Sequence, residues 1–130
     1  MKRTGPIELK DAFKQATDDQ DKICQPEKTV TTVKKRMQTM ALNILEKTDR
    51  IDNGRLDIPV FFSTCGHDAR AVIGTRKQMG KGATPAQAEA SAVMELAERF
   101  SFFSFYKNRR HTQTGTWEQF RKEAISFEQI

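Results

Sequence analysis

Apolar positions recur every three or four residues in two long parts of the chain, and this period predicts helices. The first predicted helix covers residues 27 to about 45, and its apolar positions are Val30, Val33, Met37, Met40, Ala41 and Ile44. The second covers residues 85 to about 105. It begins with a threonine cap, a first-turn proline and a glutamine that can close a capping box, at Thr84, Pro85 and Gln87. Shorter helices are expected at residues 5–17 and from Thr116 to about residue 125.

Two compact apolar runs between the long helices predict strands, at residues 59–62 and 69–75. Residues 52–54 (Asp-Asn-Gly) are a turn signal before the first run, and a polar loop at residues 65–68 joins the two. Helices mixed with short, antiparallel-type strands predict an α+β fold. We expect one folded unit at residues 27–130, preceded by a polar segment at residues 1–26.

Composition narrows the class of protein only partly. A length of 130 residues suits one core, and 22 Lys and Arg against 17 Asp and Glu give a net charge of +5. This charge fits a nucleic acid, a nucleotide or an acidic peptide about equally well, and simple solubility is favoured over any one of them. Cys24 and Cys65 lack the spacing of a zinc site or a disulfide framework. With no signal peptide and no membrane-spanning run, we expect a soluble cytoplasmic protein without a membrane partner.

The long helix has acidic residues on a surface that its composition predicts to be buried. Ser91, Glu95 and Glu98 are four and three positions apart, so they form one stripe. Apolar residues surround the rest of the helix, which is typical of a buried helix. Buried carboxylates one turn apart must protonate, pair with Arg99 or another cation, or bind a metal ion such as Mg²⁺. A solvated, salt-bridged surface is the alternative, and spacing alone does not decide between them.

A glycine-rich segment at residues 79–83 (Met-Gly-Lys-Gly-Ala) precedes this helix and offers a position where backbone NH groups could bind an anion. It does not fit a Walker A loop, because Gly74 and Gly80 enclose five residues and Gly82 follows Lys81. A flexible connection with an exposed lysine is equally compatible. His67, in its polar loop, lacks a recognisable nucleophile–base arrangement. The basic run at residues 107–111 is interpreted as a solvated loop, so a nucleic-acid partner is disfavoured.

Several motifs together resemble the YcaO family. They are the turn Gly80-Lys81-Gly82, the helix start Thr84-Pro85, and the helix pattern S-x-x-x-E-x-x-E-R formed by Ser91, Glu95, Glu98 and Arg99. Upstream, Lys28-Thr29-Val30, Asp49-Arg50-Ile51 and Asp57-Ile58-Pro59-Val60 fit as well. The resemblance covers about residues 27–106. It implies a partial YcaO-like domain, corresponding to the N-terminal portion of that domain.

The resemblance implies chemistry that spacing alone does not predict. YcaO proteins use ATP and Mg²⁺ to phosphorylate a peptide amide oxygen, and attack on the activated carbon gives an azoline ring (cyclodehydration) or a thioamide (thioamidation). Carried over, Glu95 and Glu98 are expected to bind magnesium, and Ser91, Arg99 and Lys81 to lie at the nucleotide.

The family's site also needs a second glutamate-bearing helix and a later arginine- and proline-rich region. We therefore expect this chain to form an incomplete site for a peptide or protein substrate, with the missing half of the domain or a partner protein completing it. Whether the chain alone is an enzyme is left open. The competing hypothesis is a non-catalytic basic module that binds peptide or nucleic acid through residues 34–36 and 107–110.

Overall fold

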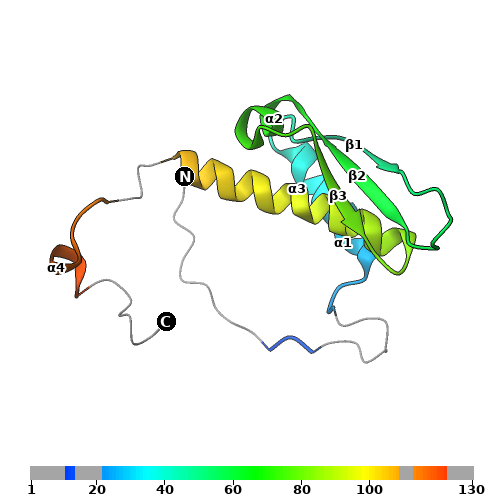
Figure 1. Ribbon diagram of the computed structural model, residues 1–130, viewed down its shortest axis with the longest axis horizontal. Helices are drawn as coiled ribbons and strands as arrows, with labels where there is room; N and C mark the ends of the chain where they lie inside the picture. The colour runs from blue at the N-terminus through cyan, green and yellow to red at the C-terminus, as the bar shows by residue number, and fades with distance from the viewer. Residues whose placement is uncertain (1–10, 14–21, 109–112, 123–130) are drawn as a thin grey trace.

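A three-stranded antiparallel sheet with two long helices on one face forms the core of the structure. The computed structural model describes residues 11–13, 22–108 and 113–122 (Figure 1). Along the chain the elements are α1 (Pro26–Thr39), β1 (Leu45–Arg50), β2 (Val60–Cys65), α2 (His67–Ile73), β3 (Lys77–Lys81), α3 (Pro85–Lys107) and α4 (Trp117–Phe120). The strand order is β1-β2-β3. The predicted α+β class is confirmed. The helix expected at residues 5–17 lies largely outside the described residues.

The strand register decides which side chains face the helices. Thr48 pairs with Ser63, and Ser63 pairs with Gln78, so one residue from each strand lies in a row across the sheet. Ser63 Oγ donates to the carbonyl of Ala92 on α3 at 2.8 Å. Because side chains alternate along a strand, this row lies on the face covered by α3.

The core lies between that face and the helices. Its buried members come from five elements or their flanks, and they are Met37, Ile44, Cys65, Ala69 and Leu96. Leu96 is fully buried at the middle of α3, and Val33, Leu45, Ile73, Ala97 and Phe100 pack around the cluster. Burying one such side chain contributes about 1.5–3 kcal/mol. The long helix α3 is therefore the element on which the others assemble.

The first helix is shorter than predicted, and a strand follows it. α1 ends at Thr39, since Met40 adopts an extended conformation, whereas the apolar period predicted helix to about residue 45. Ile44 is 2% exposed and belongs to the entry into β1. The sequence missed β1 because most of its six residues are polar and lack the alternation of a half-buried strand. A bulge between Leu45 and Lys47 breaks that alternation.

The strand predicted at residues 69–75 is wrong, because this segment forms α2. Gly66 is the N-cap of α2 and has an extended conformation. Gly74 ends the helix at φ 82°, and the NH of Gly74 donates to the carbonyl of Arg70. Only a residue that tolerates positive φ ends a helix in this way at little cost. A seven-residue apolar run fits either a strand or a short helix, and the two glycines decide in favour of the helix.

The turn predicted at residues 52–54 lies slightly later, at residues 54–57. Gly54 has φ 73°, and the Asn53 side chain accepts from the NH of Arg55 at 3.1 Å. The Asp52 carboxylate accepts from Arg50 Nε at 2.8 Å and from the NH of Val60 at 3.0 Å. These bonds, the one from Arg50 first, hold the pKa of Asp52 well below its ordinary value. The carboxylate thus ties together the two strand ends that flank this connection.

Among the described helices, none has the length and apolar character needed to cross a bilayer. The helix predicted from Thr116 does begin there, with the NH of Thr116 donating to Gln119 Oε1 at 2.9 Å. It comprises four residues and is shorter than predicted, because residues 121–122 form a turn; residues 123–125 of its predicted length lie outside the described residues.

Candidate functional site

The start of α3 is built as its sequence predicts. Thr84 Oγ1 accepts from the NH of Gln87 at 3.2 Å, and Gln87 Oε1 accepts from the NH of Ala83 at 2.9 Å. Pro85 occupies the first turn, where its missing NH costs nothing. These local contacts fix where α3 begins and therefore which of its residues point toward the sheet.

The glycines before α3 are explained by close packing. Gly80 lies within β3, so the segment predicted as a loop is a strand as far as Lys81. A Cβ on Gly80 would lie 2.7 Å from Ala92 Cα and closer still to the NH of Ala92 and the carbonyl of Ala88. A Cβ on Gly82 would lie 2.5 Å from the nitrogen of Ala88. Both glycines let β3 approach α3, and Lys81 is exposed at the end of the strand.

The predicted stripe on α3 lies on an accessible face of the helix. Ser91 and Glu98 are exposed, and the side chain of Glu95 is 40% exposed. The prediction that these carboxylates are buried is wrong. The sheet and α1 cover only the side of α3 that bears Ala88, Ala92, Val93 and Leu96. The apolar residues that suggested burial all round include Met94 and Phe102, which are 44% and 59% exposed.

Arg99 is held between the stripe and the sheet. Its Nε lies 2.9 Å from Glu95 Oε1, and its Nη1 donates to Gln78 Oε1 at 3.2 Å. Of the three solutions proposed for the carboxylates, the structure therefore contains the ion pair at Glu95. Gln78, on β3, was missed by sequence reasoning, because nothing in the pattern of a single strand indicates which helix residue its side chain will meet.

A second polar cluster joins α1, β1 and α3. Glu89 Oε1 accepts from Lys34 Nζ and from Thr48 Oγ1, each at 2.6 Å, and Lys34 also donates to Thr48. Partial burial by itself raises the pKa of Glu89. The hydrogen bonds from Lys34 and Thr48 and the charge of Lys34 outweigh it and lower the pKa below its ordinary value. Glu89 was not among the predicted site residues, and Lys34 was predicted to lie on a basic face open to ligands.

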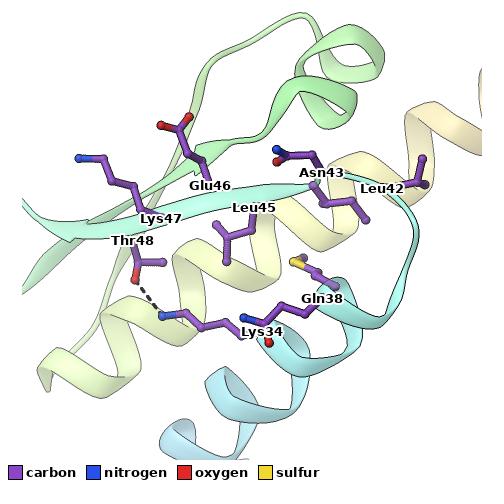
Figure 2. Close-up of a pocket in the computed structure, with 10 residues that line it drawn as sticks. Lys34, Gln38, Leu42, Asn43, Leu45, Glu46, Lys47 and Thr48 are labelled. Carbon is purple, nitrogen blue, oxygen red and sulfur yellow. Dashed lines mark hydrogen bonds between the residues drawn. The ribbon is translucent and has the colours of Figure 1, made fainter.

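A groove of about 320 Å³ lies beside this cluster, between α1 and β1. Figure 2 shows Leu45 and Thr48 pointing toward α1, whereas Glu46 and Lys47 point away from it. This arrangement follows from the bulge in β1, which turns two successive side chains to the same side. The residues that line the groove do not include any member of the predicted stripe.

Two other candidates have structural roles in the described residues. His67 is the first residue of α2, and its Nδ1 lies 3.4 Å from Asp68 Oδ1. Asp68 in turn accepts from the NH of Asn43 at 2.7 Å, the largest cause of its lowered pKa. Lys107 Nζ donates to the carbonyl of Ala71 at 3.0 Å, which ties the end of α3 to α2. Residues 109–111 of the basic run lie outside the described residues.

The family comparison agrees with the motifs. Residues 79–130 match the family model described as YcaO cyclodehydratase, ATP- and Mg²⁺-binding. The matched segment begins within β3 and includes all of α3, and it covers less than half of the chain. The resemblance to the YcaO family is thereby confirmed for this segment, and the match is consistent with a partial YcaO-like domain. It supports an ATP-dependent function of the YcaO type. No curated protein and no solved structure matched the chain.

The donor atoms of the stripe suit magnesium. Mg²⁺ prefers oxygen ligands and is commonly held by one or two carboxylates together with substrate phosphates. Glu95 and Glu98 offer carboxylates one turn apart on an accessible face, and the Ser91 hydroxyl lies on the same stripe. Among the residues that the structure describes, no group of three or more His, Cys, Asp or Glu side chains comes together. A metal at Glu95 would share this carboxylate with Arg99, whose Nε pairs with Oε1.

Proposed function

We propose that this chain forms one wall of a YcaO-type site that binds ATP and Mg²⁺ and activates a backbone amide of a peptide or protein substrate. The observation that supports it most is the family match over residues 79–130, the segment that contains the whole stripe. The accessible position of Ser91, Glu95 and Glu98 on one face of α3 supports it as well, because a nucleotide can reach them.

In this proposal the residues have distinct roles. Glu95 and Glu98 hold magnesium, and Ser91 contacts the nucleotide. Arg99 and Lys81 neutralise phosphate charge, Arg99 from α3 and Lys81 from the end of β3. ATP would supply the phosphoryl group to the amide oxygen, with release of ADP, which makes the amide carbon electrophilic. A nucleophile would then attack this carbon and the oxygen would leave as phosphate, giving an azoline or a thioamide according to the nucleophile. The protein acts mainly by positioning charges around the phosphates, as is usual for phosphoryl transfer.

The exposure of the stripe supports the hypothesis that another segment completes the site. Phosphoryl transfer is favoured where water is excluded and donors are preorganised. Glu98 is exposed, and the apolar side chains of Met94 and Phe102 are uncovered on the accessible part of the same helix. A further part of the domain, or a partner protein, would cover this face and shield the phosphates.

Titration with ATP in the presence and absence of Mg²⁺, followed by calorimetry and by amide NMR shifts on α3, tests the proposal. We expect weak, magnesium-dependent binding in the millimolar range, lost in Glu95→Gln and Glu98→Gln. Glu118→Gln on α4 is the matched control, since its side chain is 78% exposed and outside the stripe. An α3 that does not respond to millimolar Mg·ATP would refute the ATP site. Micromolar affinity that depends on Glu95 would refute the need for a second wall.

The competing hypothesis of a basic binding module is not favoured by any observation in the described residues. Lys34 is bonded to Glu89 and Thr48, and Lys107 is bonded to the carbonyl of Ala71. These contacts engage two of the lysines on which that hypothesis depends.

A further inference from the structure

Gln78 is a buried amide whose hydrogen-bonding groups are all directed at named partners. It is 5% exposed, and it lies in β3 on the face covered by α3. Its Nε2 donates to Thr75 Oγ1 at 2.6 Å and lies 3.8 Å from Cys65 Sγ. Its Oε1 accepts from Arg99 Nη1 at 3.2 Å.

The chemistry of the partners fixes the orientation of this amide. A guanidinium only donates hydrogen bonds, so Gln78 must present its oxygen to Arg99. The NH₂ group must then point toward Thr75 and Cys65, both of which can accept. The amide therefore cannot flip without losing its bond to Arg99, and it holds the side chain of Arg99 at a fixed place on the sheet.

We infer that Gln78 is a positioning residue that holds the Arg99 guanidinium against Glu95, so that Arg99 is the resident counter-ion which competes with a metal for this carboxylate. Gln78 restrains a long arginine side chain that would otherwise sample many rotamers. Arg99 is thereby kept beside Glu95 at a contact of 2.9 Å. When the metal takes Glu95, the bond to Gln78 keeps the guanidinium close by, where the phosphates would lie. The metal part of this inference rests on the proposed function.

The positioning role is tested by NMR on the full chain without any ligand. Gln78→Met keeps the unbranched shape but removes the acceptor, and Gln78→Glu keeps an acceptor for Arg99. Ser63→Ala is the matched control, because it removes a buried bond from the same sheet face to α3 without touching Arg99. We expect the Arg99 Nε–H group to be ordered in the wild type, Ser63→Ala and Gln78→Glu. In Gln78→Met we expect it to be mobile, with an order parameter below about 0.6. An unchanged order parameter in Gln78→Met would overturn the inference.

Competition with metal is tested with Mn²⁺ alone, which accepts the same oxygen ligands as Mg²⁺ and broadens nearby amide signals. We expect the Mn²⁺ concentration that half-broadens the signals around Glu95 to fall about two- to fivefold in Gln78→Met, the scale of a half-exposed ion pair. Arg99→Ala should lower this Mn²⁺ concentration at least as much. Adding Gln78→Met to the Arg99→Ala variant should cause no further decrease. Equal midpoints in wild type and Gln78→Met would refute the competition.

The two proposals fail in different ways. Broadening that is absent from α3, or unchanged in Glu95→Gln, would refute the metal site of the proposed function. The order of Arg99 would still decide whether Gln78 is its positioning residue, because that measurement involves neither metal nor nucleotide.

Discussion

The contact between β3 and α3 predicts a large loss of stability in Gly80→Ala. The added Cβ would lie 2.7 Å from Ala92 Cα and nearer still to backbone atoms of Ala88 and Ala92, whereas ordinary contacts are 3.4–4 Å. These neighbours are backbone atoms of a buried helix turn, so they cannot rotate away. Either β3 or α3 must shift, and the shift would disturb the packing around Leu96, which is fully buried on the same helix.

The expected cost follows from two opposing effects. Overpacking a well-packed core costs about 1–3 kcal/mol, and rigid backbone neighbours place this site at the upper end. Alanine in place of glycine in a strand recovers about 0.5–1 kcal/mol of conformational entropy. We therefore expect the free energy of unfolding to fall by about 2–3 kcal/mol, which corresponds to a decrease in Tm of about 10–20 °C for a folded unit of this size.

Thermal unfolding followed by circular dichroism measures this effect, and Gly54→Ala is the comparison. A Cβ at Gly54 would meet nothing within 4 Å, but the residue has φ 73°, so its substitution costs only the conformational strain of about 1–2 kcal/mol. Urea unfolding gives the free energies for the same set. A loss in Gly80→Ala no larger than in Gly54→Ala would show that β3 and α3 are not packed as closely as described.

Three further predictions concern the core and the second polar cluster. Because the pKa of Glu89 is lowered in the fold, its charged form stabilises the protein at pH values above the ordinary pKa of a glutamate, and this stabilisation is lost as the pH falls through the lowered pKa. Glu89→Gln should therefore reduce the difference in urea stability between pH 7 and pH 4. An unchanged difference would show that the bonds to Lys34 and Thr48 do not stabilise the charged form. Leu96→Ala should lower the free energy of unfolding by about 2–5 kcal/mol by the same measurement, and a loss below about 1 kcal/mol would contradict its central place in the core. Cys24 is exposed and Cys65 buried, so a thiol reagent should alkylate the first much faster in the native protein, as peptide mass spectrometry would show; equal rates would contradict the burial of Cys65.

Parts of the fold that depend on neighbouring residues could be predicted. The start of α3 follows from Thr84, Pro85 and Gln87, which cap the helix through contacts within four residues. The turn at Gly54 and the strand after Pro59 follow equally local signals. β1 was missed, because the strand is mostly polar and pairs with β2 across the connection between them.

The candidate site also has features that were predictable from the sequence and features that were not. The spacing of Ser91, Glu95 and Glu98 on one helix stripe was predictable, because it needs only helical geometry. Their burial was predicted wrongly, since composition does not tell which sides of a helix the sheet will cover. The anchoring of Arg99 by Gln78 was not predictable, because the two residues are 21 positions apart and meet only when β3 packs on α3.

The sequence by itself therefore determined the long helix, its acidic stripe and the motifs that resemble the YcaO family, because each depends only on residues a few positions apart. Only the tertiary structure decided that the stripe is accessible, that Arg99 pairs with Glu95, and that Gly80 allows β3 to pack closely against α3. The physical reason is that exposure, ion pairing and close packing depend on what lies across the interface between elements, and those neighbours come from distant parts of the chain.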